Sequence, residues 1–390
     1  MFSVFAAARK PLARFAPILF AVFLASCDPS AFGGGQSINL GKPIPVALLV
    51  PGGSGNSGDA VLAASLENAA RLAMADLDGI NFDLRVYNTA GQSAIAATAA
   101  RQAVNDGAKI ILGPVFAESA NAAGLAVAAR NVNVLSFSNN AAIAGGNVFV
   151  LGPTFQNTAN RLVRYAVSQG KGHIMIVNAQ DGAEVIGRDA ISRAIINGGA
   201  TLAGVTSFEL SQESVIAAIP QITSDAQSRG AQAIFLTSGT SGALPFLAQL
   251  LPESGLDRNA VQFIGLQRWD IPATALTLPG LQGGWFALPD PRLSSRFQDR
   301  YLSAYGTLPH PIAGLAYDGI AAIGALVSAG KADALTRGAL TQSAGFVGVN
   351  GVFRLLADGT NERGLAVAMI EDNQVTVIDP APRSFGGAGF

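Results

Sequence analysis

The sequence is poor in charged residues, and those it has are not clustered. Asp, Glu, Lys and Arg make up 13% of its 390 residues, whereas an average soluble domain has about a quarter. The formal net charge is −1, and no run of Lys and Arg follows the N-terminus. Because nucleic-acid-binding proteins hold phosphates with clustered basic side chains, we expect no nucleic-acid partner.

Metal ligands and catalytic motifs are also scarce. The chain has one cysteine, Cys27, and two histidines, His173 and His310. A single cysteine cannot form an internal disulfide, and these three residues lie too far apart in sequence to predict a zinc site. The patterns G-x-S-x-G, H-E-x-x-H and G-K-[ST], which mark common catalytic and phosphate-binding sites, do not occur. We therefore expect a protein without metal, cofactor or catalysis.

The first residues are organised like a bacterial secretory signal. Arg9, Lys10 and Arg14 precede or adjoin an apolar segment over residues 15–24, which is shorter than the ~20 residues needed to cross a bilayer. Leu-Ala-Ser-Cys, ending at Cys27, resembles the lipobox, in which the cysteine is acylated and becomes the mature N-terminus. The alternative is a cleaved signal with an incidental cysteine.

This pattern predicts how the mature protein is held. We expect residues 1–26 to be a lipoprotein signal peptide, Cys27 to carry the lipid, and the Gly/Ser/Pro-rich residues 27–44 to form a flexible tether. The protein would then be periplasmic and lipid-anchored to the cell membrane or the outer membrane.

Residues 109–140 predict a βαβ unit around which the rest of the chain is organised. Apolar runs at 110–112 and 132–135 flank an alanine-rich helical segment, and Gly113-Pro114 makes a turn after the first run. A right-handed crossover makes the two strands parallel, so their carboxyl ends lie at one edge of the sheet, where open α/β sheets bind ligands. The loops 113–119 and 136–140 are therefore candidate binding loops.

The same unit carries a family resemblance. The Gly113-Pro114 loop, the helix and the following V-x-x-L-S-x-S pattern that ends at Ser138 resemble the first lobe of type I periplasmic solute-binding proteins of the leucine-binding branch. Tyr317-Asp318 lies in a segment that resembles the family pattern A-x-x-Y-D-A. The closer likeness is to lipoproteins called penicillin-binding protein activators, and the order of segments fits from Pro45 to about Asp379.

The resemblance implies a two-lobed α/β fold, each lobe a mostly parallel sheet flanked by helices. Alternating apolar runs and helical patterns along the chain agree with it. We expect lobe one to comprise residues 45–152 and 292–343, and lobe two residues 158–280 and 346–378. The chain would cross between lobes near Gly152, Leu288 and Gly345, and residues 379–390 would form a loose tail.

In such a fold, ligands bind between the lobes, where loops at strand ends converge. The candidate ligand-binding residues in lobe one are Gly53, Ser54, Phe116, Ala117, Ser138, Asn139 and Asn140, and those in lobe two are Gln180, Asp181, Thr237, Ser238, Arg268 and Trp269. We expect Phe116, Asn140, Thr237 and Trp269 to surround one cavity when the lobes close. Arg268 would bind a carboxylate beside the flat wall of Trp269; alternatively, Arg268 is a surface residue over a half-buried indole.

Two details limit what can be inferred about the ligand. Residues 53–58 match G-x-G-x-x-G, but the next predicted strand ends at Asn88 rather than at an acidic residue, and Asp59 would repel a pyrophosphate. Where the amino-acid binders have a serine and an Ala-Thr pair, this chain has Ala117 and Asn139-Asn140. We expect no dinucleotide, and the ligand's identity cannot be taken from the family.

The leading functional hypothesis, implied by the resemblance, is a non-catalytic envelope lipoprotein that regulates a penicillin-binding peptidoglycan synthase, with a small amino-acid- or peptide-like ligand. The alternative is the substrate-binding lipoprotein of a branched-chain-type amino-acid ABC importer, whose partner is a permease.

Overall fold

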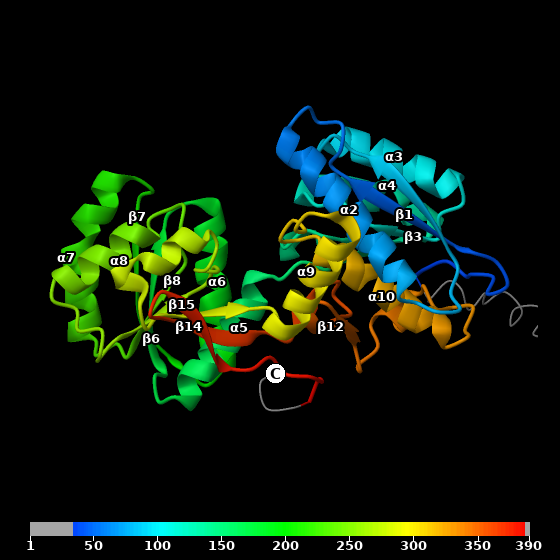
Figure 1. The fold of residues 1–390 in the computed structure, drawn as a ribbon. Coiled ribbons are helices and arrows are strands. Elements are labelled where there is room, and N and C mark those ends of the chain that lie inside the picture. Colours follow the sequence, from blue (N-terminus) through cyan, green and yellow to red (C-terminus); the bar gives the residue numbers. More distant parts are fainter. Residues whose placement is uncertain (1–33, 387–390) are drawn as a thin grey trace, which may run out of the picture.

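The computed structural model describes residues 34–386, which form two α/β lobes joined by three passages of the chain (Figure 1). The predicted signal peptide and Cys27 lie outside the described residues. The two-lobed fold expected from the sequence is confirmed.

Lobe one is built on a five-stranded parallel sheet with the order β2-β1-β3-β4-β5. The strands are β1 (Ile44–Val50), β2 (Phe82–Asn88), β3 (Ile110–Leu112), β4 (Asn133–Ser136) and β5 (Val148–Val150). Its helices are α2 (Ser57–Ala75), α3 (Ser93–Asn105), α4 (Ala117–Val127), α9 (Pro291–Tyr305), α10 (Gly314–Ser328) and α11 (Arg337–Leu340), with short 3₁₀ turns at Ala128–Arg130 and Ala141–Ile143. Strands β1, β3 and β5 consist of apolar residues, as expected where helices cover both faces of a parallel sheet.

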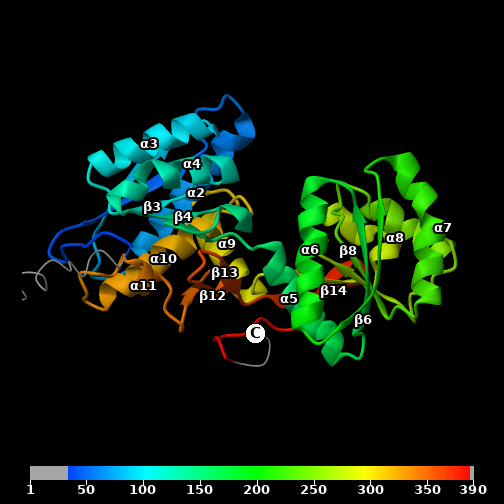
Figure 2. The ribbon, with the colours of Figure 1, turned by 180° about the vertical axis from the view of Figure 1, so that it is seen from behind.

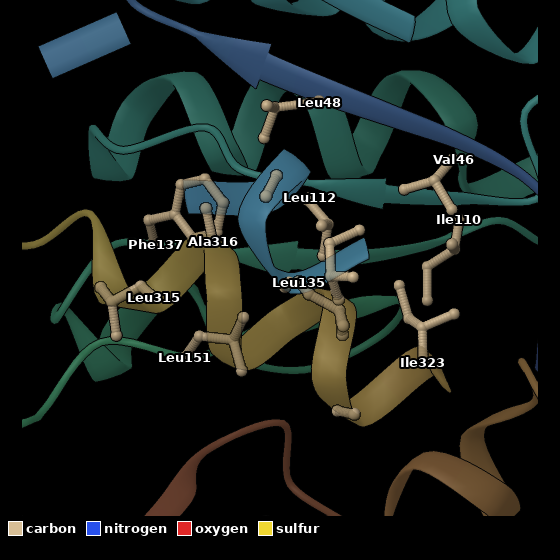
Figure 3. Packing of buried hydrophobic residues seen from close by; sticks show 14 of the residues in the cluster. Val46, Leu48, Ile110, Leu112, Leu135, Phe137, Leu151, Leu315, Ala316 and Ile323 are labelled. Carbon is tan, nitrogen blue, oxygen red and sulfur yellow. The ribbon is translucent and has the colours of Figure 1, made fainter. Parts of the chain in front are cut away.

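Alternating side chains of each strand pack on opposite faces of this sheet. Leu48 and Leu112 belong to the buried cluster that also contains Leu66 of α2 and Ala316 of α10. Figure 3 shows Leu48, Leu112 and Ala316 within this cluster. Leu49 and Ile111 point the other way and pack against α3 and α4, which lie on the far side of the sheet from α10 in both ribbon views (Figure 2). This alternation is the period of two expected of a strand.

Lobe two has a seven-stranded sheet with the order β15-β14-β10-β9-β8-β6-β7. The β10–β14 and β14–β15 pairings are antiparallel, and the other pairings are parallel. The strands are β6 (His173–Ala179), β7 (Thr201–Phe208), β8 (Ala233–Leu236), β9 (Gln262–Gly265), β10 (Trp285–Leu288), β14 (Ala366–Glu371) and β15 (Gln374–Asp379). Helices α5 (Phe155–Ser168) and α6 (Gly182–Asn197) cover one face, and α7 (Gln212–Ser228) and α8 (Leu244–Glu253) cover the other. Two 3₁₀ turns, Ala273–Thr277 and Pro279–Leu281, follow β9.

The C-terminal region differs from the prediction that residues 346–378 belong to lobe two. Strands β11 (Phe346–Gly348), β12 (Gly351–Leu355) and β13 (Asn361–Arg363) form a separate antiparallel sheet. Phe346 and Phe353 are buried in the lobe-one core together with residues of α10. The chain therefore passes into lobe two after β13, and not near Gly345. Strand alternation indicates a buried face, but it does not indicate which lobe covers that face.

Both segments predicted to be loose are packed where the structure describes them. Ile38, expected in the tether, is only 6% exposed in the lobe-one core, and its N–H donates to Ala332 O. Ala381, expected in the tail, is buried against lobe two, and the guanidinium of Arg354 lies over the ring of Phe385. Each segment is held by a single buried apolar residue within a Gly- or Pro-rich stretch. Because one apolar residue produces no periodic pattern, the sequence did not predict this packing.

Candidate functional site

A cavity of about 160 Å³ lies between the lobes, lined by residues that follow strand ends of both sheets. Pro153 comes after β5 of lobe one, whereas Arg268, Ile271 and Pro289 come after β9 and β10 of lobe two. The remaining lining residues are Pro311, Ile312, Leu315, Asn350, Arg363 and Leu365. The cavity is thus at the edge where the carboxyl ends of parallel strands meet, as expected for a ligand site in this class of fold.

The lining is mainly apolar, with two guanidinium groups and one amide among the polar side chains. Arg268 is 38% exposed, and its Nε donates to Asp270 Oδ1 at 2.9 Å while its Nη2 contacts the other carboxylate oxygen. Its Nη1 makes no hydrogen bond with residues 34–386. Arg268 therefore keeps a donor for a ligand oxygen, although Asp270 offsets its charge.

The second guanidinium belongs to a buried ion pair. Arg363 Nη1 lies 3.1 Å from Asp318 Oδ2, and the two side chains are 3% and 0% exposed. The N–H of Val349 and the amide of Asn350 also donate to the Asp318 carboxylate, at 2.8 and 3.1 Å. Burial raises the pKa of Asp318, and the contact with Arg363 opposes that effect. With every carboxylate oxygen bonded, the pair is a structural element more than a free binding group.

Arg363 and its neighbours tie the passages between the lobes together. We call residues 151–154, 289–290 and 363–365, together with Asp318, Asn157 and Asn361, the joint. Arg363 Nε donates to Leu151 O at 2.8 Å, and the Asn361 amide donates to Val150 O at 2.6 Å and Gly152 O at 2.9 Å. Asn157 on α5 donates to Asn361 Oδ1 at 2.7 Å. The joint therefore links lobe one to the first helix of lobe two through buried hydrogen bonds.

The predicted residues of lobe one lie on three loops at strand ends, and most of their polar atoms are used locally. The Ser54 hydroxyl accepts from Asn56 N, Ser138 is 5% exposed and accepts from Asn140 N, and Asn140 accepts from Ala142 N. Gly53, at φ +85°, and Asn139 are exposed, while Ala117 begins α4. Phe116 is 40% exposed, so its ring and the Asn139 amide are the groups that this lobe leaves open.

In lobe two the predicted polar residues surround a carboxylate that we did not predict from the sequence. Thr237 and Ser238 are at most 1% exposed, and their hydroxyls donate to Glu184 at 2.8 and 2.9 Å. The backbone N–H of Ala179 also donates to Glu184, at 2.6 Å. Asp181 caps α6 by accepting from Glu184 N at 2.8 Å, and Gln180 is exposed. The D-x-x-E spacing resembles a capping box and could have predicted Glu184.

Comparison with known families identifies the fold. Residues 43–374 match the family model described as "Periplasmic binding protein". The chain belongs to this family. A comparison with curated proteins finds no match.

Solved structures of periplasmic binding proteins agree with this assignment. A putative branched-chain amino acid ABC transporter protein from Rhodospirillum rubrum has a TM-score of 0.73 at 17% identity, over 86% of this chain and 99% of that one. A substrate-binding protein from Desulfitobacterium hafniense in complex with Leu has a TM-score of 0.65 at 17% identity, over 86% and 100%. One from Rhodopseudomonas palustris, in complex with 3,4-dihydroxybenzoic acid, has a TM-score of 0.59 at 17% identity, over 88% and 97%. At this identity the likeness shows the fold alone.

One predicted cleft residue of this periplasmic binding protein is buried elsewhere. Trp269 has 0% exposure and lies in the lobe-two core, stacked on Phe286 with ring centroids 6.4 Å apart. Gly265 and Gly284 make room for the indole, since a Cβ on either would come within 2.2 Å of it. The prediction that Trp269 forms a wall of the cleft is wrong, and so is the expected cavity of Phe116, Asn140, Thr237 and Trp269, because Thr237 is buried as well.

Two further properties of the described residues bear on location and chemistry. Within residues 34–386, helices long and apolar enough to span a bilayer are not found. The same residues contain no group of three or more His, Cys, Asp or Glu side chains placed to hold a metal ion.

Proposed function

We propose that this chain is the non-catalytic solute-binding protein of an ABC importer, and that it captures a small carboxylate-bearing solute between its lobes. The observation that carries the proposal is the cavity at the strand ends of both sheets, with Arg268 at its edge. Its apolar walls suit a hydrocarbon or aromatic body, and the free Nη1 of Arg268 suits a carboxylate oxygen. Structural neighbours bound to Leu and to 3,4-dihydroxybenzoic acid have ligands of this chemistry.

Ligand-induced stabilisation tests the proposal directly. Leucine and 3,4-dihydroxybenzoate are added separately to purified protein, and the melting temperature is followed against ligand concentration, because a ligand that binds only the folded state raises it. Any hit is measured by calorimetry. If neither these two compounds nor a panel of small carboxylates shifts the melting temperature, the proposal fails.

Two variants, each with a matched control, test whether the solute binds in the interlobe cavity. Ile271→Trp, at a cavity residue that is 42% exposed, fills the space and should abolish ligand shifts, whereas Ile196→Trp on α6, at a residue 78% exposed, should leave them unchanged. Arg268→Ala should weaken binding by about 1.5–3 kcal/mol, the scale of a hydrogen bond to a charged group. Arg71→Ala on α2 is its matched control. Equal effects of Arg268→Ala and Arg71→Ala would make Arg268 a packing residue.

Regulation of a penicillin-binding peptidoglycan synthase is the second candidate, and this role would need no bound solute. The side chains of Thr237, Ser238, Asn140 and Asp181 are already bonded within the protein, so the strand-end loops hold their shape without a ligand. Cross-linking in native membranes, followed by identification of the partner, separates the two functions. A permease supports the importer, and a synthase supports the regulator.

We also propose a lipid anchor at Cys27, on the lipobox-like sequence that ends there. Cys27→Ser should release the protein from membranes or leave it unprocessed. Normal cleavage with unchanged membrane fractionation would disprove the anchor without affecting the proposed ligand site.

A further inference from the structure

A second concave surface adjoins the joint at Asp290. It has a volume of about 360 Å³ and is lined by the first turns of α9, by the β11–β12 hairpin and by the segment after β15. We call it the arginine groove, because Arg292 and Arg296 on α9 and Arg383 of the C-terminal segment line it. The C-terminal end of the described chain lies beside the junction of the lobes in both ribbon views (Figures 1 and 2).

The charges of this groove are not balanced locally. Its one acidic residue, Asp290, is 7% exposed and caps α9 by accepting from Arg292 N at 2.9 Å; its carboxylate is 3.9 Å from the Arg292 guanidinium. Within residues 34–386, the Arg296 and Arg383 side chains have no hydrogen bond or ion pair. By contrast, Arg300, one turn further along α9, contacts Asp76, and nearby Arg354 contacts Glu362. In a chain with a net charge of −1, three arginines around one hollow form a local positive field.

The groove also has an apolar surface beside an edge strand. Leu293, Val352 and Pro382 line it, and Val347 on β11 is 67% exposed. Strand β11 pairs only with β12, so it is the edge of its sheet. An inorganic anion would use the guanidinium groups but not this apolar surface, whereas an extended peptide with acidic and apolar side chains would use both.

We propose that the arginine groove binds an extended acidic segment of a partner protein. Carboxylates of the segment pair with Arg292, Arg296 and Arg383, and an apolar side chain covers Val347. Because α9 and β11 pack with lobe one while residues 382–383 continue from the lobe-two sheet, a docked segment contacts both lobes. This interaction is separate from solute capture and does not depend on it.

Fluorescence anisotropy with the full mature chain and a labelled peptide of alternating Glu and Leu tests the groove. The Glu/Leu peptide should bind, and raising the salt concentration should weaken binding, since the attraction is between exposed charges. Peptides with Gln or Lys in place of Glu should not bind. Equal binding of the Gln peptide would overturn the proposal, as would binding of inorganic phosphate or of anionic vesicles in place of the peptide.

Matched variants locate the binding site. The double variant Arg292→Gln/Arg296→Gln should weaken the Glu/Leu peptide by about tenfold or more, and Arg383→Gln should weaken it less. Arg71→Gln/Arg193→Gln, which removes two exposed arginines elsewhere, should have little effect. Loss of binding in the control pair, or retention in the groove variant, would overturn the proposal. The change in melting temperature on adding leucine is measured in the same variants. This second measurement shows whether a failure concerns the arginine groove or the proposed solute site.

Discussion

The joint between the lobes and the strand-end loops both contain many polar side chains, but these side chains bond over very different sequence distances. In the joint, Arg363 bonds to the carbonyl of Leu151, 212 residues away, and Asn361 bonds to that of Val150, 211 residues away. In the loops, Asn140 bonds to Ala142 and Asp181 to Glu184, two and three residues away, whereas Thr237 and Ser238 bond to Glu184 over 53 and 54 residues within lobe two. Bonds within one lobe shape the loops, and the longest-range bonds hold the lobes to each other.

The joint and the strand-end loops also differ in how deeply their residues are buried. Asp318 and Arg363 are 0% and 3% exposed. In the loops, Gly53, Asn139 and Gln180 are exposed, and Thr237 and Ser238 are buried. A buried polar group that loses its partner remains desolvated, but an exposed one turns to water. Substitutions in the joint should therefore cost stability, and substitutions at the exposed loop positions should mainly change binding.

Arg363→Met should cause the largest loss. It leaves the Asp318 carboxylate buried without its cation, and breaking one side of such a pair costs about 3–5 kcal/mol. Arg71→Met, in the exposed α2 pair with Glu67, should cost at most about 0.5 kcal/mol. Urea unfolding of both variants measures the difference. If the two losses are equal, the buried pair does not hold the joint.

Asn361→Ala should come next. It leaves the buried carbonyls of Val150 and Gly152 and the Asn157 amide without this partner, at a cost of about 1–3 kcal/mol. The matched control is Asn139→Ala, at the exposed loop position. Urea unfolding should give a smaller loss for the control, and the reverse order would contradict the comparison.

Asp181→Ala should have a smaller effect than either joint variant. The substitution removes the N-cap of α6, worth about 1 kcal/mol, while Asp181→Asn keeps an acceptor and should retain most of the stability. Thermal unfolding of the two variants measures the cap. A loss as large as that of Arg363→Met would mean that the Asp181–Glu184 cluster also supports tertiary packing.

The smallest expected effect is the contribution of His310 to the pH dependence of folding stability. Partial burial lowers the pKa of His310, and its Nδ1 accepts from Ile312 N at 3.4 Å, which requires the unprotonated ring nitrogen. The unfolded chain binds the proton more readily, so this contribution is present above about pH 6.5 and is lost as pH falls through the lower folded pKa.

The two histidines of the chain make this simple to check. Melting temperatures of wild type and His310→Gln are compared at pH 7.5 and 5.5, and the two histidine signals are titrated by NMR. The acid-induced decrease should be smaller in the variant. An identical decrease would assign the pH dependence to other groups.

The family resemblance, together with the alternation of apolar runs and helical patterns, predicted the two-lobed fold, and the structure places strands at Ile110–Leu112 and Asn133–Ser136, where the apolar runs 110–112 and 132–135 were expected to form them. These patterns did not predict the direction in which each side chain at the site points. Arg268 does line the interlobe cavity, but its neighbour Trp269 points into the core, because glycines far along the chain leave room for the indole.

Short stretches of sequence are enough to specify the helices, strands and local bonds, because helical and strand periodicity, caps and short turns depend on residues within a few positions of each other. Three features became visible in the folded chain alone: the packing of β11–β13 on lobe one, the hydrogen bonds from Thr237 and Ser238 to Glu184, and the bonds of Arg363 to Asp318 and Leu151. These depend on which segments meet in space, and burial then requires each polar group that meets there to find a partner, wherever along the chain that partner lies.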